Sequence, residues 1–491
     1  MADPAGGAAT IATLRRVAIL PVFALVLGLA GCGDGDVTWT MMPAPVIMKD
    51  ARLDFVRFVA PENRGTDVRV LYATTRAPAP AGARERYAQS AGDGVRLGQA
   101  HVQLGEPGWS FAELVASDRT SSVDALRPAR VTSVEEFGPM GGDADRAFVA
   151  AIDRQVQASN TGEAVIYVPG YRVTFNQMMV FMGGWAHYLG RSSAVVTFSW
   201  PTGTRVWNYF LDCRRARAFI PDIERLMALI AEQSQARRLN LIAFSCGSPL
   251  LAEAVVRLRS RHPEEDHAAL QRRYRIGNAI FVAADIDLKT FARSHLPALS
   301  DIAVRTEVYV SEDDGALKWA SRLAGASRLG RPNLDELTRA DLETLASNER
   351  LVGIDVAGVY GPHELGGMRG HGYFFANNRV SSDVLLSMIY PFPPAWRALT
   401  HSPGRGMWTF PDDYPQRVGD ALYEAAPTLR RKTSRRAGPA NKETVPRRSP
   451  GPRSSNSPRR NAATSRSAEG IRRDPERLGG PRPQGGPRAV R

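Results

Sequence analysis

Short apolar segments alternate with amphipathic segments through the middle of the chain, and this alternation limits the fold more than any other feature of the sequence. The apolar segments are predicted to be strands and comprise residues 68–74, 164–168, 194–200, 239–244, 279–284, 307–310 and 351–359. Between them, apolar residues recur at helical spacing in segments such as 175–189, 216–232 and 249–261. The sequence therefore predicts an α/β fold, with a mainly parallel central sheet and helices on both faces.

A serine stands at the junction between one of these strands and the helix that follows it. Ser245 comes directly after segment 239–244, and Pro249 opens the next helical segment. In parallel sheets the functional groups gather beyond the carboxyl ends of the strands. A serine on a tight strand-to-helix turn exposes its hydroxyl above that edge of the sheet. Ser245 is therefore the predicted nucleophile.

The residues around Ser245 suit such a turn. The usual pattern is G-x-S-x-G, and this chain has Ala243 and Gly247 at the two glycine positions. Both residues are small, so the strand and the helix can approach each other closely. In the alternative interpretation the junction carries only a helix-capping serine, which would be Ser248.

A nucleophilic serine needs a base, and the base needs an acid that orients it. In this kind of fold the acid precedes the histidine in chain order. Asp313 and Asp314 both follow the predicted strand 307–310, and His363 and His371 both follow the last predicted strand. Spacing alone leaves both choices open. A structural interpretation is also available for two of them, Asp313 as a helix cap and His363 as a surface turn residue.

The oxyanion hole of such a site is built from backbone N–H groups, one of which belongs to the residue after the nucleophile. Here that residue is Cys246, whose side chain is interpreted as a small buried hydrophobe rather than a reactive thiol. The second donor is expected in the loop after segment 164–168, where Gly170 permits a sharp turn. Either Tyr171 or Arg172 then offers the N–H.

The cysteine content argues against other classes of site. The three cysteines, Cys32, Cys213 and Cys246, are too few for a disulfide scaffold. No CxxC motif or Cys/His cluster has the spacing of a structural metal site. The sequence therefore implies no metal and no organic cofactor.

The N-terminal sequence predicts where the protein is located in the cell. Two arginines precede an apolar run, residues 17–30, that is too short to span a bilayer and ends in Leu-Ala-Gly-Cys. This ending resembles a bacterial lipobox, whose cysteine, here Cys32, is lipidated; an ordinary signal peptide is the alternative. Gly33, in place of an aspartate, favours the outer membrane, facing the periplasm. Residues 1–32 are thus predicted as a lipoprotein signal peptide, and residues 33–65 as a tether.

The C-terminus accounts for the basic character of the chain. The formal net charge is +13, and residues 431–491 alone hold 17 Lys and Arg against 4 Asp and Glu. The rest of the chain is therefore formally neutral, so specific nucleic-acid binding is not expected. The segment has almost no large apolar residues, which predicts disorder. A weak contact with polyanions is the one partner that its charge suggests.

Several motifs, taken in order, resemble a bacterial α/β-hydrolase family of unknown function with many predicted lipoproteins. They are VLYATTR (70–76), VIYVPGYRVTFN (165–176), TFSWPTGT (197–204), LNLIAFSCG (239–247), FVAADIDLKTF (281–291), VYVSEDDGALK (308–318) and RGHGYFFANNRVSSD (369–383). The resemblance covers roughly residues 65–395 and implies an α/β-hydrolase fold. It places the nucleophile on Ser245, the acid on Asp314 within Y-x-S-x-x-D-x-A-L, and the base on His371 within G-H-x-Y-F.

The chain departs from the family at two places. The family usually has His-Gly in the oxyanion loop, and this chain has Pro169-Gly170. It usually has His-Ser-Met-Gly-Asn at the elbow, and this chain has Phe-Ser-Cys-Gly-Ser, beginning at Phe244. Neither change touches a triad position, but both alter the walls around the nucleophile.

The expected protein is a membrane-tethered, carboxylesterase-like serine hydrolase that acts on a small-molecule or lipid-like ester. Its hydrolase domain is predicted to span residues 66–400, followed by an extension at 401–430 and the basic tail at 431–491. The two departures motivate an alternative of another class, a binding or scaffold lipoprotein that keeps the fold without turnover. A fold of this kind supports many chemistries, so the substrate is not predicted.

Overall fold

The computed structural model describes residues 38–122, 125–203, 208–359, 370–390 and 392–431, all of which belong to one unit of the chain, Met1–Lys432. The predicted signal peptide at 1–32 and all but the first residue of the predicted basic tail lie outside the described residues. None of the described helices combines the length and the apolar composition that crossing a bilayer requires.

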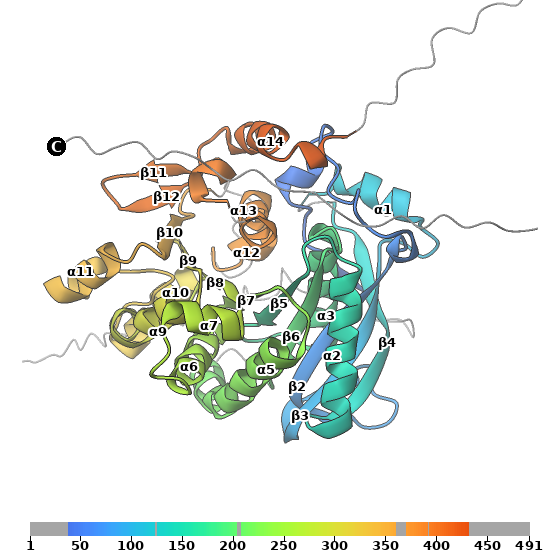
Figure 1. Cartoon of the computed structure of the whole chain (residues 1–491), viewed down its shortest axis with the longest axis horizontal. Helices are drawn as coiled ribbons and strands as arrows, with labels where there is room; N and C mark the ends of the chain where they lie inside the picture. Colours follow the sequence, from blue (N-terminus) through green and yellow to red (C-terminus); the bar gives the residue numbers. More distant parts are fainter. Residues whose placement is uncertain (1–37, 123–124, 204–207, 360–369, 391, 432–491) are drawn as a thin grey trace, which may run out of the picture. The chain divides into compact units, whose positions relative to one another are not determined.

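Twelve strands of the described residues form one sheet in the order β1-β4-β3-β2-β6-β5-β7-β8-β9-β10-β12-β11 (Figure 1). Pairing is parallel from β2 through β12, and the β1-β4-β3-β2 edge and the final β12-β11 pair are antiparallel. The prediction of a mainly parallel sheet is therefore confirmed. The strands are β1 (Trp39–Thr40), β2 (Asp67–Pro78), β3 (Tyr87–Leu104), β4 (Pro128–Pro139), β5 (Glu163–Val168), β6 (Ser193–Ser199), β7 (Arg238–Phe244), β8 (Ile276–Val282), β9 (Arg305–Val310), β10 (Leu351–Asp355), β11 (Thr400–Ser402) and β12 (Met407–Thr409).

Helices cover both faces of the sheet. Successive strand residues point to opposite faces, so Ile166 packs in one apolar core and its neighbour Val165 in the other. Figure 1 shows α5, α6 and α9 on one side of the strands and α12, α13 and α14 on the other. The helices are α1 (Phe111–Asp118), α2 (Gly142–Gln157), α3 (Phe175–Tyr188), α4 (Tyr209–Ala216), α5 (Ile220–Gln233), α6 (Gly247–Ser260), α7 (His267–Tyr274), α8 (Leu288–Thr290), α9 (Leu296–Ile302), α10 (Gly315–Ala324), α11 (Arg339–Ala346), α12 (Tyr373–Ala376), α13 (Asn378–Ile389) and α14 (Tyr414–Ala425).

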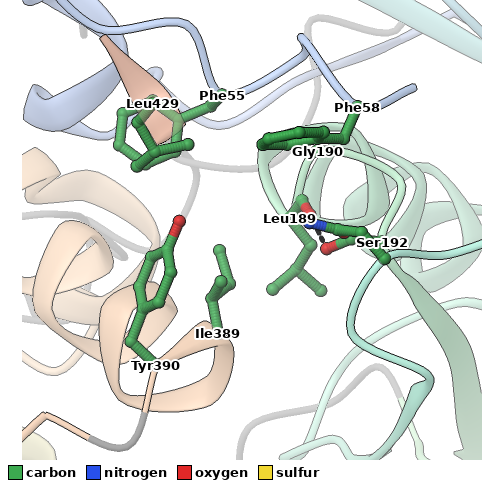
Figure 2. Close-up of a pocket in the computed structure, with 9 residues that line it drawn as sticks. Phe55, Phe58, Leu189, Gly190, Ser192, Ile389, Tyr390 and Leu429 are labelled. Carbon is green, nitrogen blue, oxygen red and sulfur yellow. Dashed lines mark hydrogen bonds between the residues drawn. The ribbon is translucent and has the colours of Figure 1, made fainter. Parts of the chain in front are cut away.

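The tether predicted for residues 33–65 is wrong for its described part. From Thr38 onward this segment packs on the domain: β1 pairs with β4, and Met41, Ile47 and Leu53 are buried. Figure 2 shows Phe55 and Phe58 lining a small crevice with Leu429. The segment is held by scattered apolar residues and not by a periodic pattern, which is why the sequence did not reveal it.

The domain also continues past residue 400, where a C-terminal extension was predicted. β12 adds to the sheet beside β10, and Tyr414, Val418 and Leu422 of α14 are buried. The backbone N–H of Asp54 donates to the carbonyl of Leu429 at 2.8 Å, so the two ends of the described chain are joined. The folded domain therefore spans the described residues from 38 to 431.

Candidate active site

Ser245 lies on a sharp turn between β7 and α6. Its φ of 51° is in the left-handed region, which few residues other than glycine adopt. The turn is tight enough that a Cβ on Gly247 would collide with the carbonyl oxygen of Pro169, so the strand, the helix and the neighbouring loop meet here. Ser248 does not cap α6, because its buried hydroxyl has no hydrogen-bond partner among the described residues. The capping interpretation of this junction is therefore wrong.

Three predicted side chains meet at this turn. His371 Nε2 lies 2.8 Å from Ser245 Oγ, and His371 Nδ1 lies 2.7 Å from Asp314 Oδ2. All three residues are buried, with Ser245 only 3% exposed. Asp314 is fixed a second time, because its Oδ1 accepts the backbone N–H of Leu317 at 2.9 Å and caps α10. The imidazole thus stands between a hydroxyl and an anchored carboxylate.

The alternative acids and base lie elsewhere. Asp313 is exposed, and its Oδ2 accepts the N–H of Gly358 at 3.3 Å. Asp287, a further carboxylate in the segment after β8, caps α8, where its Oδ1 accepts the N–H of Thr290 at 2.7 Å. His363 falls outside the described residues.

The loop after β5 packs against the elbow, as the predicted oxyanion hole requires. A Cβ on Gly170 would lie 3.1 Å from Ser245 Cβ, and Arg172 has a left-handed φ of 63°. Two buried side chains hold this loop: Trp200 Nε1 donates to the carbonyl of Pro169 at 2.9 Å, and Arg76 Nη2 donates to that of Val173 at 2.7 Å. These contacts fix the backbone that carries Tyr171 and Arg172.

Cys246 lies at the start of α6, and no acceptor for its backbone N–H is found among the described residues. Its side chain is buried, as predicted, but it forms a disulfide with Cys213 of α4. The expectation of an unbonded buried cysteine is therefore corrected. The bond ties α4 to the residue directly after Ser245, and no local sequence pattern indicates this pairing.

Three further polar residues stand beside Ser245. The Tyr209 hydroxyl donates to Asp285 Oδ2 and also interacts with the Ser245 hydroxyl. Arg328 Nε forms an ion pair with Asp285 Oδ1 at 3.0 Å, without hydrogen-bond geometry. Burial raises the pKa of Asp285 above its ordinary value, although Arg328 and Tyr209 oppose this. Tyr209 gave no signal in the sequence, because it directly follows no predicted strand and belongs to no motif of the site.

An open cleft of about 560 Å³ adjoins this group on the side of α4. The disulfide, Asp285 and Arg328 contribute to its walls, whereas Ser245 and His371 do not. Its lining residues are Phe210, Cys213, Arg214, Arg217, Cys246, Pro249, Asp285, Ile286, Asp287, Thr290, His295, Leu323, Ala324 and Arg328. Residues of α4 thus form one wall of the cleft, and Cys246, the neighbour of Ser245, forms part of another.

One cluster among the described residues has the composition of a metal site. His262, Glu264 and Glu265 could each direct a ligand atom to a common point. They follow the C-terminal end of α6, whereas Ser245 precedes its N-terminal end. A helix of 14 residues separates the two by about 20 Å. The cluster is therefore remote from Ser245.

Residues 144–388 match the model of a family described as alpha/beta hydrolase of unknown function (DUF900). The matched region contains β5 to β10, the elbow, Asp314 and His371. A search of curated proteins finds no match to this chain.

Proposed function

Over residues 144–388 the chain belongs to a family of α/β-hydrolases of unknown function, and from this premise we propose that it is a serine hydrolase that cleaves an ester, thioester or amide. The observation that carries the proposal is the hydrogen-bonded series from Ser245 through His371 to Asp314. A serine with only a packing role would need neither the left-handed backbone at Ser245 nor an imidazole held by a carboxylate that is itself fixed as the N-cap of α10.

Each group then has one task. Ser245 Oγ attacks the carbonyl carbon while His371 Nε2 takes its proton. The backbone N–H groups of Cys246 and of the Tyr171–Arg172 loop stabilise the resulting oxyanion. His371 returns the proton to the leaving group, which departs and leaves an acyl-serine. Water, deprotonated by the same imidazole, then hydrolyses the acyl-serine and restores the hydroxyl. Asp314 keeps the imidazole in the tautomer that this sequence needs.

A carboxylesterase-like activity is the form of this proposal that we favour. Pro169 and Phe244, the two residues at which the chain departs from the family pattern, both make defined contacts. The carbonyl of Pro169 accepts a hydrogen bond from Trp200 Nε1, and the Phe244 ring packs against the imidazole of His371 with ring centroids 5.0 Å apart. Phe244 therefore forms an apolar wall against one side of the base.

The burial of Ser245 favours the second candidate function, a binding or scaffold protein without turnover. Labelling with a fluorophosphonate probe separates the two, because only an activated serine is phosphonylated. We expect the intact protein to be labelled, Ser245→Ala to be unlabelled, and the matched Ser248→Ala to be labelled at the parental rate. An unlabelled parent protein, or a labelled Ser245→Ala, would reject the hydrolase proposal.

We also propose that Cys32 is lipidated and anchors the domain to the outer membrane, facing the periplasm. The sequence before Cys32 supports this, and so does the Cys213–Cys246 disulfide, a bond typical of oxidising compartments. Cys32→Ser should move the exported protein from the membrane to the soluble fraction. If the parent protein already fractionates as soluble, the anchor does not exist.

A further inference from the structure

One face of α4 contacts both the residue that follows Ser245 and the oxyanion loop. Tyr209, Asp212 and Cys213 are spaced by three and four residues and therefore share one helix face. Cys213 is bonded to Cys246, beside the nucleophile. Asp212 Oδ2 accepts the hydroxyl of Tyr171, in the oxyanion loop, at 3.0 Å. The helix is thus fastened to both sources of the proposed oxyanion donors.

Tyr209 is the residue of this face that reaches the nucleophile. Its hydroxyl interacts with that of Ser245 and donates to Asp285. Its ring packs edge-to-face on Tyr171, with centroids 5.4 Å apart. The ring of Tyr209 therefore packs against the side chain of Tyr171 in the oxyanion loop, and its hydroxyl meets Ser245 and Asp285.

We propose that Tyr209 is a further catalytic residue, whose hydroxyl donates a hydrogen bond to the negative charge of the tetrahedral intermediate. It would act as a third donor beside the N–H of Cys246 and that of the loop after β5. This inference rests on the proposed hydrolase function. It adds a side-chain donor to a hole that the sequence predicts from backbone groups alone.

The surroundings of Tyr209 favour this role over simple packing. Burial and the Asp285 carboxylate raise the pKa of the Tyr209 hydroxyl well above 10, so it stays protonated and remains a donor. Asp285 is itself held by Arg328 and by its own N–H, which donates to the Ser245 carbonyl at 3.2 Å. Before substrate binds, Asp285 holds the hydroxyl in place. When the oxyanion forms, the hydroxyl needs only a rotation of its O–H bond to donate to it.

Steady-state ester hydrolysis by Tyr209→Phe tests the inference. The substitution removes the hydroxyl and keeps the ring that packs on Tyr171. We expect kcat to fall by about 10²-fold, the loss typical of one oxyanion donor, with KM changed by less than about threefold. Fluorophosphonate labelling of Ser245 should slow in parallel. Tyr274→Phe is the matched control and should change neither rate, since it removes a buried hydroxyl of α7 that has no hydrogen-bond partner among the described residues.

Asp285→Asn separates a catalytic hydroxyl from a structural one. It leaves the Tyr209 hydroxyl but weakens its anchor, so its loss in kcat should be smaller and should vanish in the Tyr209→Phe background. A kcat for Tyr209→Phe within about twofold of the parent, an effect on KM alone, or additive losses in the double variant would each overturn the inference. A labelled parent protein with an unaffected Tyr209→Phe rejects the role of Tyr209 only. An unlabelled parent rejects the hydrolase proposal and this inference together.

Discussion

The described residues contain two buried Asp–His pairs, and only one of them faces a serine hydroxyl. His371 binds Asp314 through Nδ1 at 2.7 Å, and His187 binds Asp118 through Nε2 at 2.9 Å. The remaining nitrogen of His371 lies 2.8 Å from the Ser245 hydroxyl. The remaining nitrogen of His187 has no hydrogen-bond partner among the described residues.

The carboxylates differ as well. Asp118 also pairs with Arg127, whose guanidinium contacts the Tyr188 hydroxyl, so α1, α3 and the start of β4 are joined at this point. Asp314 has a backbone N–H as its second partner, and the described residues give it no cation. The two pairs therefore differ in what the second imidazole nitrogen faces. The proposed proton transfer is open to His371, which faces a hydroxyl, whereas the His187 pair joins secondary-structure elements.

Ser245→Ala is the variant with the largest expected effect, and it tests the difference between the two Asp–His pairs. It removes the group that distinguishes the first pair from the second, and loss of such a serine typically costs about 10⁶-fold in kcat. We expect ester hydrolysis to fall to background while the thermal unfolding midpoint changes little, because only one hydroxyl is lost. Near-parental activity would mean that the two pairs are alike and that chemistry occurs elsewhere.

Asp314→Asn should lower kcat by about 10⁴-fold, since an amide no longer selects the tautomer in which Nε2 accepts the serine proton. Asp313→Asn is the matched control and should leave kcat within about twofold, because its side chain is exposed and faces Gly358. The measurement is hydrolysis of a short-chain ester by both variants. Small and equal losses would make Asp285 the better acid candidate.

The contrast between Asp313 and Asp314 also shows how much of the candidate site could be predicted from the sequence. Every triad candidate follows a strand, and strand ends are visible because β5 to β9 are buried on both faces and read as continuous apolar segments. Choosing Asp314 required the family resemblance, because neighbouring residues in a turn point in different directions. In the structure Asp314 is buried and Asp313 is exposed.

Other parts of the fold and of the site could not be predicted, because no local sequence pattern marks them. β3 and β4 are antiparallel and partly exposed, so their mixed polar and apolar residues do not form an apolar run. Tyr209 and Cys213 reach the site because α4 packs across the elbow, a tertiary contact that no spacing in the sequence encodes. Residues 38–65 join the fold through short elements, which lack a recognisable period. In residues 401–430 the strands β11 and β12 are equally short, whereas the buried Tyr414, Val418 and Leu422 of α14 recur at helical spacing, a pattern that the prediction of an extension did not use.

Asp118→Asn should lower the stability of the protein and leave kcat nearly unchanged, whereas Asp314→Asn should mainly lower kcat. The variant leaves Arg127 buried without its carboxylate, and breaking a buried ion pair in this way typically costs about 3–5 kcal/mol of unfolding free energy. The pair lies away from the elbow, so kcat of the folded protein should stay within about twofold of the parent. Denaturant unfolding and hydrolysis, measured on the same preparation, separate the two effects. A large loss of kcat with unchanged stability would show that the second pair also takes part in catalysis.

The smallest expected effect is the pH dependence of the contribution that Asp118 makes to the unfolding free energy. Burial opposes ionisation of Asp118, but His187 and Arg127 outweigh it and hold the pKa of this carboxyl below its ordinary value of 3.8. A carboxyl with a lowered pKa in the folded state contributes stability that is complete above its unfolded pKa and is lost as the pH falls through its folded pKa. Over the range in which the carboxyl titrates, the stability difference between the parent and Asp118→Asn should therefore be full at about pH 5 and narrow below about pH 4. Unfolding free energies measured from about pH 3 to about pH 5 test this, with Asp420→Asn as an exposed control. A difference that widens on acidification would mean that the folded state favours the protonated carboxyl, and the second pair would then be held by a neutral hydrogen bond instead of by its charges.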